Sequence, residues 1–116
     1  MTWWTDLYDD DLAAWMLHRA PPQEGERTVR FLQHRGVLPP GARVFDQGCG
    51  PGRLIAPLRQ VGAIVEGIDL VPSYIEQARS RAAAVGLDPA GFRVGDIACD
   101  TSQEPVDLVI SWWTCL

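Results

Sequence analysis

Residues 44–52 read VFDQGCGPG, an apolar pair and an acid followed by glycine at every second position. An apolar run that ends in a glycine cluster is typical of a buried strand followed by a tight turn. Gly48, Gly50 and Gly52 lack the Cβ atoms that would keep a ligand away from the backbone, and glycine tolerates the positive φ values of such turns. A helix beginning near Pro51 would direct its positive end at that ligand. Glycine clusters alone are weak signals, so a tight turn without a ligand stays open at this point.

The rest of the chain alternates between helix-like and strand-like segments. The expected order is helix 9–20, helix 24–36, strand 43–46, helix 51–62, strand 63–70, helix 72–86, strand 92–97 and strand 106–113. Strands separated by helices of about a dozen residues predict βαβ units with right-handed crossovers and a parallel sheet. We therefore expect an α/β fold, with an N-terminal helical segment (1–36) on the lid and substrate side of a cofactor-binding core (37–116).

Acids end two of the expected strands. An acid at the position of Asp69, which ends the second strand, can accept hydrogen bonds from both ribose hydroxyls of a nucleoside. Asp96 ends the third strand and precedes Ile97, and such a pair could read an adenine amino group while packing on the ring. Alone, Asp69 is more often an acid at a helix start, where Ser73 and Glu76 would form a capping box, and Asp96 a solvated loop acid. Combined with the glycine turn, the two acids indicate a nucleoside cofactor.

The glycine spacing distinguishes between cofactors. G-C-G-P-G, with Asp46 before it, is tighter than the G-x-G-x-x-G of dinucleotide-binding proteins. It resembles the first motif of class I S-adenosylmethionine-dependent methyltransferases, acid-x-G-x-G-x-G. The resemblance continues through GIDL, VGDI and PVDLVISWW, over roughly residues 37–113. It implies a Rossmann-like parallel sheet with visible strand order 3-2-1-4, later strands absent from this chain, and S-adenosyl-L-methionine as cofactor.

The resemblance also implies roles for individual residues. Asp46 would lie near the methionine portion of the cofactor, and Asp69 would hold the ribose hydroxyls. Leu70 and Ile97 would enclose the adenine, whose amino group Asp96 would bind. The implied cofactor-binding residues are Asp46, Gly48, Cys49, Gly50, Gly52, Asp69, Leu70, Asp96, Ile97, Ser111 and Trp112.

The acceptor side is less well specified. Ser111 and Trp112 would lie beside the methionine moiety and the methyl group. In many small-molecule methyltransferases an N-terminal segment folds over the cofactor, so Trp3, Trp4 and Tyr8 either line an acceptor pocket or cover the edge of the sheet. Methyl transfer mainly requires alignment and exclusion of water, with a general base only for an acidic acceptor. The two histidines fall in the leading helices, so we assign no catalytic residue.

Composition sets expectations about partners. The chain has 116 residues, a formal net charge of −5 and no run of basic side chains, so we expect no nucleic-acid partner. Its acidic start and its lack of a long apolar run predict no signal peptide, no membrane partner and a cytoplasmic location. Cys49, Cys99 and Cys115 follow no zinc spacing, so we expect reduced thiols and no metal.

The last strand raises the question of completeness. Residues 106–113 would form an apolar sheet edge with unpaired backbone groups, and such an edge invites pairing. We expect a second chain there, as a hetero- or homo-oligomer, and the chain is a fragment, a subunit of a split enzyme or a self-completing oligomer. The predicted function is methyl transfer to a small molecule. The alternatives are a catalytically silent cofactor-binding or scaffold subunit and, with less support, a nicotinamide-binding domain.

Overall fold

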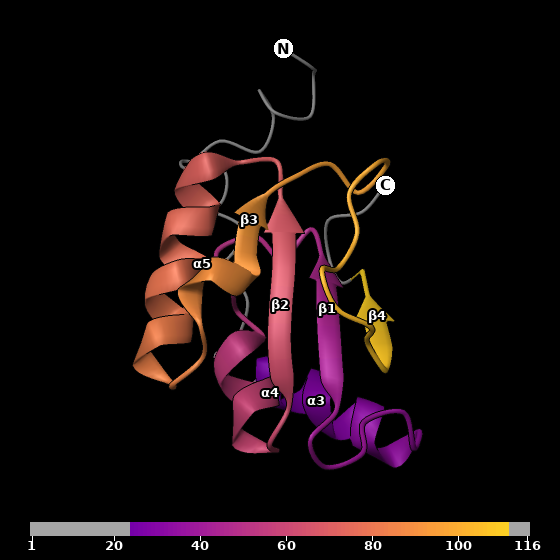
Figure 1. Ribbon diagram of the computed structural model, residues 1–116. Helices are drawn as coiled ribbons and strands as arrows, with labels where there is room; N and C mark the ends of the chain where they lie inside the picture. The colour runs from indigo at the N-terminus through magenta and orange to yellow at the C-terminus, as the bar shows by residue number, and fades with distance from the viewer. Residues whose placement is uncertain (1–23, 112–116) are drawn as a thin grey trace.

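The computed structural model describes residues 24–111 (Figure 1). The predicted helix 9–20 lies outside this range. The described elements are α3 (Glu24–His34), β1 (Arg43–Gln47), α4 (Ile55–Gln60), β2 (Ile64–Asp69), α5 (Pro72–Ala84), the 3-10 helix η1 (Pro89–Gly91), β3 (Phe92–Val94) and β4 (Leu108–Ile110).

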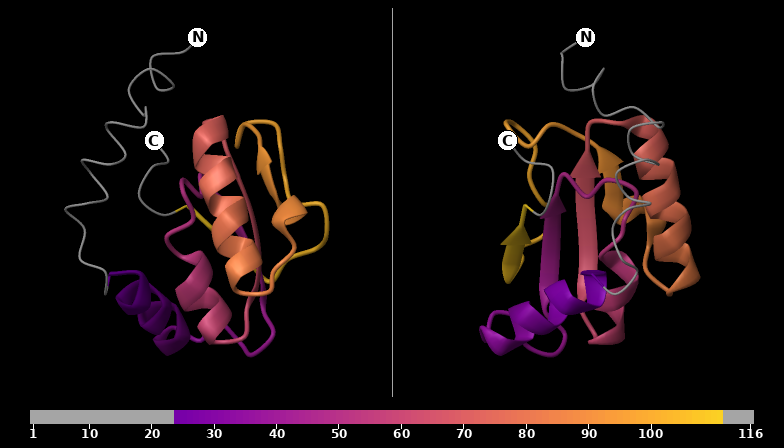
Figure 2. Two further views of the ribbon diagram at one scale, coloured as in Figure 1. Left: turned by 90° about the vertical axis from the view of Figure 1, so that its left-hand side faces the viewer. Right: turned by 180° about the vertical axis from the view of Figure 1, so that it is seen from behind.

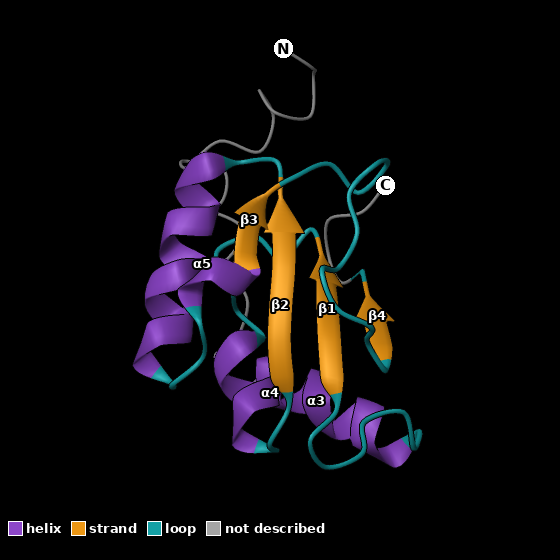
Figure 3. Cartoon of the chain, viewed as in Figure 1, coloured by secondary structure: helices purple, strands orange, loops and turns teal. Residues whose placement is uncertain are grey.

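The strands form one parallel sheet in the order β3-β2-β1-β4. β1 pairs with β2 along its whole length, with Arg43 opposite Ile64 and Gln47 opposite Ile68, whereas the edge strands β3 and β4 are short (Figure 3). This arrangement confirms the predicted α/β class and the strand order 3-2-1-4. Since β1, β2 and β3 succeed one another in a single direction across the sheet, right-handed crossovers place α4 and α5 on the same face.

The main core lies between that face and the helices, which Figure 2 shows from behind and from the side. Ala78 and Ala82 of α5 are fully buried, and their small side chains let the helix lie close to its neighbours. The strands contribute Val44, Val65, Phe92 and Ile110, and the helices contribute Val29, Leu32, Ile55, Leu58 and Ile75. Burial of this apolar surface is the main driving force for the fold.

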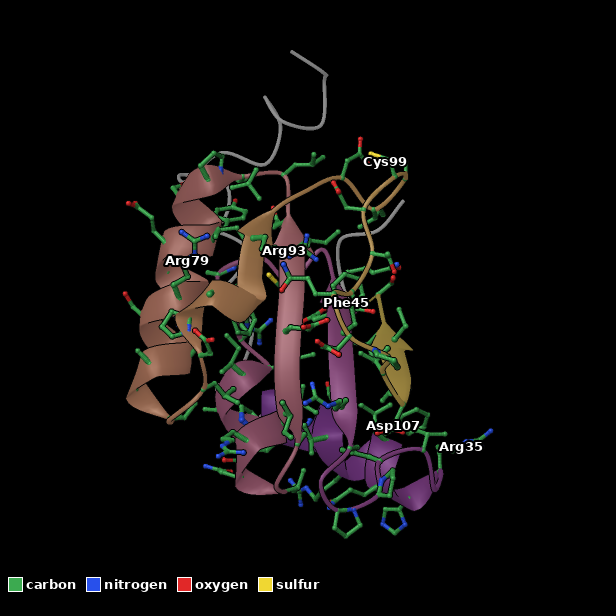
Figure 4. All side chains as sticks on the ribbon, in the orientation of Figure 1. Arg35, Phe45, Arg79, Arg93, Cys99 and Asp107 are labelled. Atoms are coloured by element: carbon green, nitrogen blue, oxygen red, sulfur yellow. The ribbon has the colours of Figure 1, made fainter. Side chains whose placement is uncertain are left out.

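The opposite face of the sheet is covered in part by the chain between β3 and β4, which crosses in front of the strands in Figure 1. Phe45 and Ile68 are the large apolar residues buried here, with 1% and 0% of their surface exposed. Arg93, labelled with Phe45 in Figure 4, donates a hydrogen bond to the Thr101 carbonyl at 2.6 Å. This contact holds the connecting segment to the sheet.

The predicted helix 24–36 corresponds to α3, which ends two residues earlier, at His34. Gly36 adopts a positive φ of 72° and donates to the Gln33 carbonyl, as expected of a glycine that terminates a helix. Val29 and Leu32 are buried on the inner face of α3. Phe31 is 53% exposed, because each residue of a helix is rotated by about 100° from the next.

The described residues 24–111 contain no helix long and apolar enough to span a bilayer. The cytoplasmic location stays a prediction. So does the division into segments 1–36 and 37–116.

Candidate cofactor-binding site

The carboxyl ends of β1, β2 and β3 lie at one edge of the sheet. The predicted site residues Asp46 and Asp69 lie in the last residues of β1 and β2, and those from Gly48 to Gly52 and at Leu70, Asp96 and Ile97 lie in the loops that follow the strands. In Figure 4 the label of Cys99 marks the loop after β3 at this edge, whereas Asp107 lies at the opposite edge. The loops after β2 and β3 start side by side, since the Gly95 amide donates to the Asp69 carbonyl at 3.0 Å.

The turn after β1 folds back onto β2. The amides of Gly48 and Cys49 both donate to the Ile68 carbonyl, at 2.8 and 2.9 Å. A Cβ at Gly67, one residue earlier in β2, would lie 3.0 Å from both the Asp46 carbonyl oxygen and the Cys49 Cβ. The turn therefore requires glycine at a position that our sequence analysis did not single out. The signal was an isolated glycine inside an apolar strand, which often marks a close backbone approach.

The three glycines of the turn have different surroundings. All adopt positive φ, 73° at Gly48, 58° at Gly50 and 88° at Gly52. A Cβ at Gly52 would lie 2.5 Å from Ile55 Cδ1 and 3.2 Å from Ala78 Cα, so this glycine allows α4 and α5 to approach each other. A Cβ at Gly50 would meet no atom within 4 Å. Gly50 thus borders open space, whereas Gly52 is closely surrounded.

The helix expected near Pro51 begins at Ile55, and residues 51–54 form turns. The prediction was wrong by one turn because Gly52, at φ 88°, has no helical conformation. Ser73 is not the N-cap that a capping box with Glu76 requires. The N-cap of α5 is Val71, with no side-chain cap, and Pro72 occupies the first turn.

Asp69 connects the glycine turn to the end of β2. Its Oδ2 accepts from the Gly50 amide at 2.9 Å, and its Oδ1 accepts from the Val71 amide at 3.0 Å. Burial raises the pKa of Asp69, and these backbone hydrogen bonds oppose that shift. The carboxylate thus lies directly beside the open space at Gly50.

Asp46 is the most deeply buried acid of the described chain. It is 4% exposed, and its Oδ1 finds no hydrogen-bond partner among the described residues 24–111. Burial, and secondarily the negative charge of Asp69, raise the pKa of Asp46 to about 8. An unsatisfied carboxyl in such a place is costly unless a ligand or proton compensates it.

Cys49 has the chemistry of an inert thiol. Its pKa is raised by burial first and by the charges of Asp46 and Asp69 second. A buried thiol kept protonated is a poor nucleophile, so Cys49 acts as a small turn residue. Its thiol lies 3.5 Å from the Gly50 carbonyl.

The predicted adenine-binding residues follow β2 and β3. Leu70 is half-buried, Asp96 is half-buried and Ile97 is 38% exposed. Asp96 Oδ1 accepts from the Ala98 amide at 2.9 Å. The sequence analysis had also passed over Asp100, whose Oδ2 accepts from the Asp96 amide at 2.8 Å.

Ser111 lies directly after β4 and donates to Gln47 Oε1 at 3.1 Å, which brings the ends of β4 and β1 together. Gln47 is a second residue that the sequence reasoning missed. Trp112, Trp3, Trp4 and Tyr8 lie outside the described residues, and their roles stay predictions. Among residues 24–111, no group of three or more potential metal ligands is assembled, and the absence of a metal stays a prediction too.

The family assignment follows from comparison with known proteins. Residues 44–116, more than half of the chain, match the family described as "Methyltransferase domain". The chain belongs to this methyltransferase family. The resemblance inferred from the glycine turn and the strand ends is confirmed, and membership disfavours the nicotinamide alternative.

Several solved methyltransferases resemble the chain. Magnesium protoporphyrin IX methyltransferase (ChlM) from Synechocystis PCC 6803, with bound S-adenosylmethionine, is 34% identical over 78% of this chain and 43% of its own, with a TM-score of 0.62. A methyltransferase from Thiobacillus denitrificans in complex with S-adenosyl-L-homocysteine is 36% identical over 72% of this chain and 34% of its own, with a TM-score of 0.56. These ligands confirm the predicted cofactor at the level of the family.

Curated relatives include an RNA-modifying enzyme. The 23S rRNA (uracil(1939)-C(5))-methyltransferase RlmD of Shewanella sp. (strain ANA-3) is 46% identical over 66 residues, which cover 57% of this chain and 15% of RlmD. The same enzyme of Shewanella sediminis is 43% identical over 65 residues. The chain therefore spans a small part of these curated relatives and less than half of the solved ones above.

The prediction that excluded nucleic acid is wrong, because these relatives are rRNA methyltransferases. We had based it on a net charge of −5. Net charge misled because it is summed over these 116 residues, whereas the match covers only 15% of RlmD, so it does not describe the surface of a whole enzyme of this kind. The expected second chain beside residues 106–113 is not shown.

Proposed function

We propose that the chain is the cofactor-binding part of an S-adenosylmethionine-dependent methyltransferase. The observation that carries this proposal is the position of Asp69. Its carboxylate accepts a hydrogen bond from the Gly50 amide at the carboxyl end of β2, beside open space at Gly50. Asp46, whose Oδ1 has no hydrogen-bond partner among residues 24–111, is buried nearby.

The residues present fit this cofactor. S-adenosylmethionine carries a sulfonium and an ammonium group and no phosphate, so it favours acidic surroundings. Asp46 and Asp69 interact electrostatically, and a positive ligand group would relieve the cost of ionising both. A pyrophosphate, which is negatively charged, would increase that cost instead.

Each residue would have a limited task. Gly50 would allow the ligand to approach the backbone, and Asp69 would accept hydrogen bonds from the ribose hydroxyls. The adenine would be held by Asp96, Leu70 and Ile97. Ser111 would lie on the side of the methionine portion. When bound, the cofactor supplies a methyl carbon already attached to an excellent leaving group. The protein then has to align the acceptor and exclude water.

For the acceptor, we propose a small molecule. Supporting this, ChlM, named for magnesium protoporphyrin IX, resembles 78% of the chain at 34% identity. RNA is the second candidate, supported by the 46% identity of 66 residues to RlmD. A catalytically silent cofactor-binding or scaffold subunit is the third candidate.

Calorimetric titration with S-adenosylhomocysteine tests the cofactor site. We expect saturable binding that Asp69→Ala weakens about tenfold or more, since a carboxylate that bonds the turn and the ribose is lost. Asp107→Ala is the matched control. Its Oδ2 accepts the Arg43 amide at 2.9 Å at the opposite edge of the sheet, so its loss should leave the affinity unchanged. Equal losses in both variants, or no binding by the folded chain, would refute the proposal.

Transfer of a labelled methyl group then separates the acceptor classes. Label in a small-molecule fraction of a metabolite extract would support the first candidate. Label in RNA would favour the second candidate. Binding of the cofactor without transfer to either would favour the silent subunit.

A further inference from the structure

In the loop after β3, the carboxylate of Asp100 forms a hydrogen bond with the backbone of a neighbouring residue. Asp100 Oδ2 accepts from the Asp96 amide at 2.8 Å, and the Asp100 amide donates back to the Asp96 carbonyl at 2.7 Å. The two residues therefore bond each other through both the amide and the carbonyl of Asp96. This reciprocal arrangement restricts the backbone of Asp96 on either side of its Cα.

The same carboxylate lies against Gly95. A Cβ there would be 3.1 Å from Asp100 Oδ2 and 3.3 Å from Ile68 Cγ2, so the approach depends on glycine. The Gly95 amide donates to the Asp69 carbonyl, which ties the start of the loop to the end of β2. At its other end, Arg93 bonds the Thr101 carbonyl at 2.6 Å. The loop is thus fastened before, at and after Asp96.

The carboxyl of Asp96 itself forms few hydrogen bonds. Its Oδ1 accepts the Ala98 amide at 2.9 Å. Within residues 24–111, the structure records no hydrogen bond to its Oδ2. One acceptor oxygen on a restrained backbone is suited to reading a single amino group, because little conformational freedom is lost when the bond forms.

We infer that Asp100 is a positioning residue that sets the selectivity of the site for an adenine base, by holding Asp96 and Ile97 in place for the exocyclic amino group. This inference rests on the proposed function, in which Asp96 reads that amino group. Asp100 itself does not contact the ligand. Its effect passes through the Asp96 backbone.

Two ligands and two variants test this role. The probes are S-adenosylhomocysteine and its purine riboside analogue, which lacks the amino group, and the measured quantity is the ratio of their dissociation constants. We expect a preference of about tenfold or more for the adenosyl ligand in the unaltered chain. Asp100→Ala should reduce this ratio toward one. Asp100→Asn keeps an acceptor oxygen for the Asp96 amide and should retain the preference.

A structural role alone would give another pattern. If Asp100→Ala left the ratio of the two dissociation constants unchanged, whether or not both ligands bound more weakly, the inference would be overturned. Asp88→Ala is the matched control, because Asp88 also bonds a backbone amide, that of Ala90 at 2.9 Å, before β3 begins. Its ratio should equal that of the unaltered chain.

Binding of the two ligands to the unaltered chain distinguishes a failure of this inference from a failure of the proposed function. An unaltered chain that binds neither ligand overturns the proposed function, and this inference with it. An unaltered chain that binds both ligands equally leaves the cofactor site standing but overturns the base selectivity assigned here. Circular dichroism of each variant shows whether it is folded. A drop in the ratio in folded Asp100→Ala, but not in Asp100→Asn, supports the inference.

Discussion

Asp46 and Asp69 illustrate how burial changes residues that look alike in sequence. Both are acids at the end of a strand, yet Asp69 bonds two backbone amides and Asp46 has an oxygen without a partner among the described residues. The proximity of the two raises the pKa of Asp46 further. A site prepared in this way favours a ligand that brings positive charge.

Asp46 makes stability dependent on pH. Its pKa is about 8 in the folded chain against 3.8 for the free side chain, so the folded state binds the proton more tightly. The free energy of unfolding should therefore be highest below about pH 4 as far as this group is concerned. It should fall as pH rises toward 8, by up to roughly 1.4 kcal/mol per pH unit. Chemical denaturation at a series of pH values measures this slope.

Asp46→Asn is the control for that slope. The amide does not titrate, so the decline between about pH 4 and 8 should shrink to the part that Asp69 contributes with the same sign. Identical slopes in the two proteins would show that Asp46 ionises normally.

Gly50→Ala should harm binding more than stability. At φ 58° a Cβ costs about 1 kcal/mol in backbone strain, and it would project into the open space beside Asp69. We expect affinity for S-adenosylhomocysteine to fall by about tenfold or more. Gly86→Ala, at φ 79° and with no atom within 4 Å, carries the same strain away from the site. If it weakens binding equally, Gly50 does not border the ligand.

At the scale of elements, the glycine turn, α4 and α5 form one packed unit. Gly52 lies where the two helices approach, and Gly67 lies where the turn folds onto β2. α4 itself is short, because the turns through residue 54 delay its start. The position of the site therefore depends on contacts between elements as much as on the turn itself.

Gly52→Ala should destabilise this unit. The new Cβ would overlap Ile55 Cδ1 at 2.5 Å and press on Ala78 Cα at 3.2 Å, in addition to the strain at φ 88°. We expect a loss of about 2 kcal/mol or more in the free energy of unfolding. Gly62→Ala has nearly the same φ, 85°, but its nearest atom lies at 3.8 Å, so it should lose only about 1 kcal/mol. Equal losses would mean that packing between α4 and α5 does not require Gly52.

At the scale of the whole molecule, the sheet has a strong centre and weak edges. β1 and β2 each pair on both sides, whereas β3 and β4 are three-residue strands at the margins. On the edge strand β4, Val109 is half exposed while Ile110 is buried. The edges should therefore open before the centre.

Hydrogen exchange followed residue by residue measures this order. Amides of β1 and β2 should exchange slowest, near the rate set by global unfolding. Amides of β4 should exchange by local opening at lower free energy, because one side of this strand has no partner strand in the described sheet. Equal protection of β4 and β1 would contradict the arrangement.

Much of the fold was predictable because its signals are local. The spacing of apolar residues alternates between that of a helix and that of a strand, and this predicted the described strands and helices. The glycine turn, with acids at two strand ends, indicated a nucleoside site. Boundaries were less accurate. The helix expected at Pro51 starts at Ile55, since a backbone at φ 88° in Gly52 is a property of packing against α5.

The sequence by itself determined the class of the fold and, through the resemblance of its motifs, the family and the strand order which that family implies. The fold class and the motifs follow from rules that act over a few residues: glycine freedom, apolar period and the residue that ends a strand. Only the tertiary structure distinguished Gly50, which borders open space, from Gly52, which packs between helices. It alone showed the raised pKa of Asp46 and the bond from the Asp96 amide to Asp100. Burial and hydrogen-bond geometry depend on side chains brought together in three dimensions, and sequence spacing does not specify them.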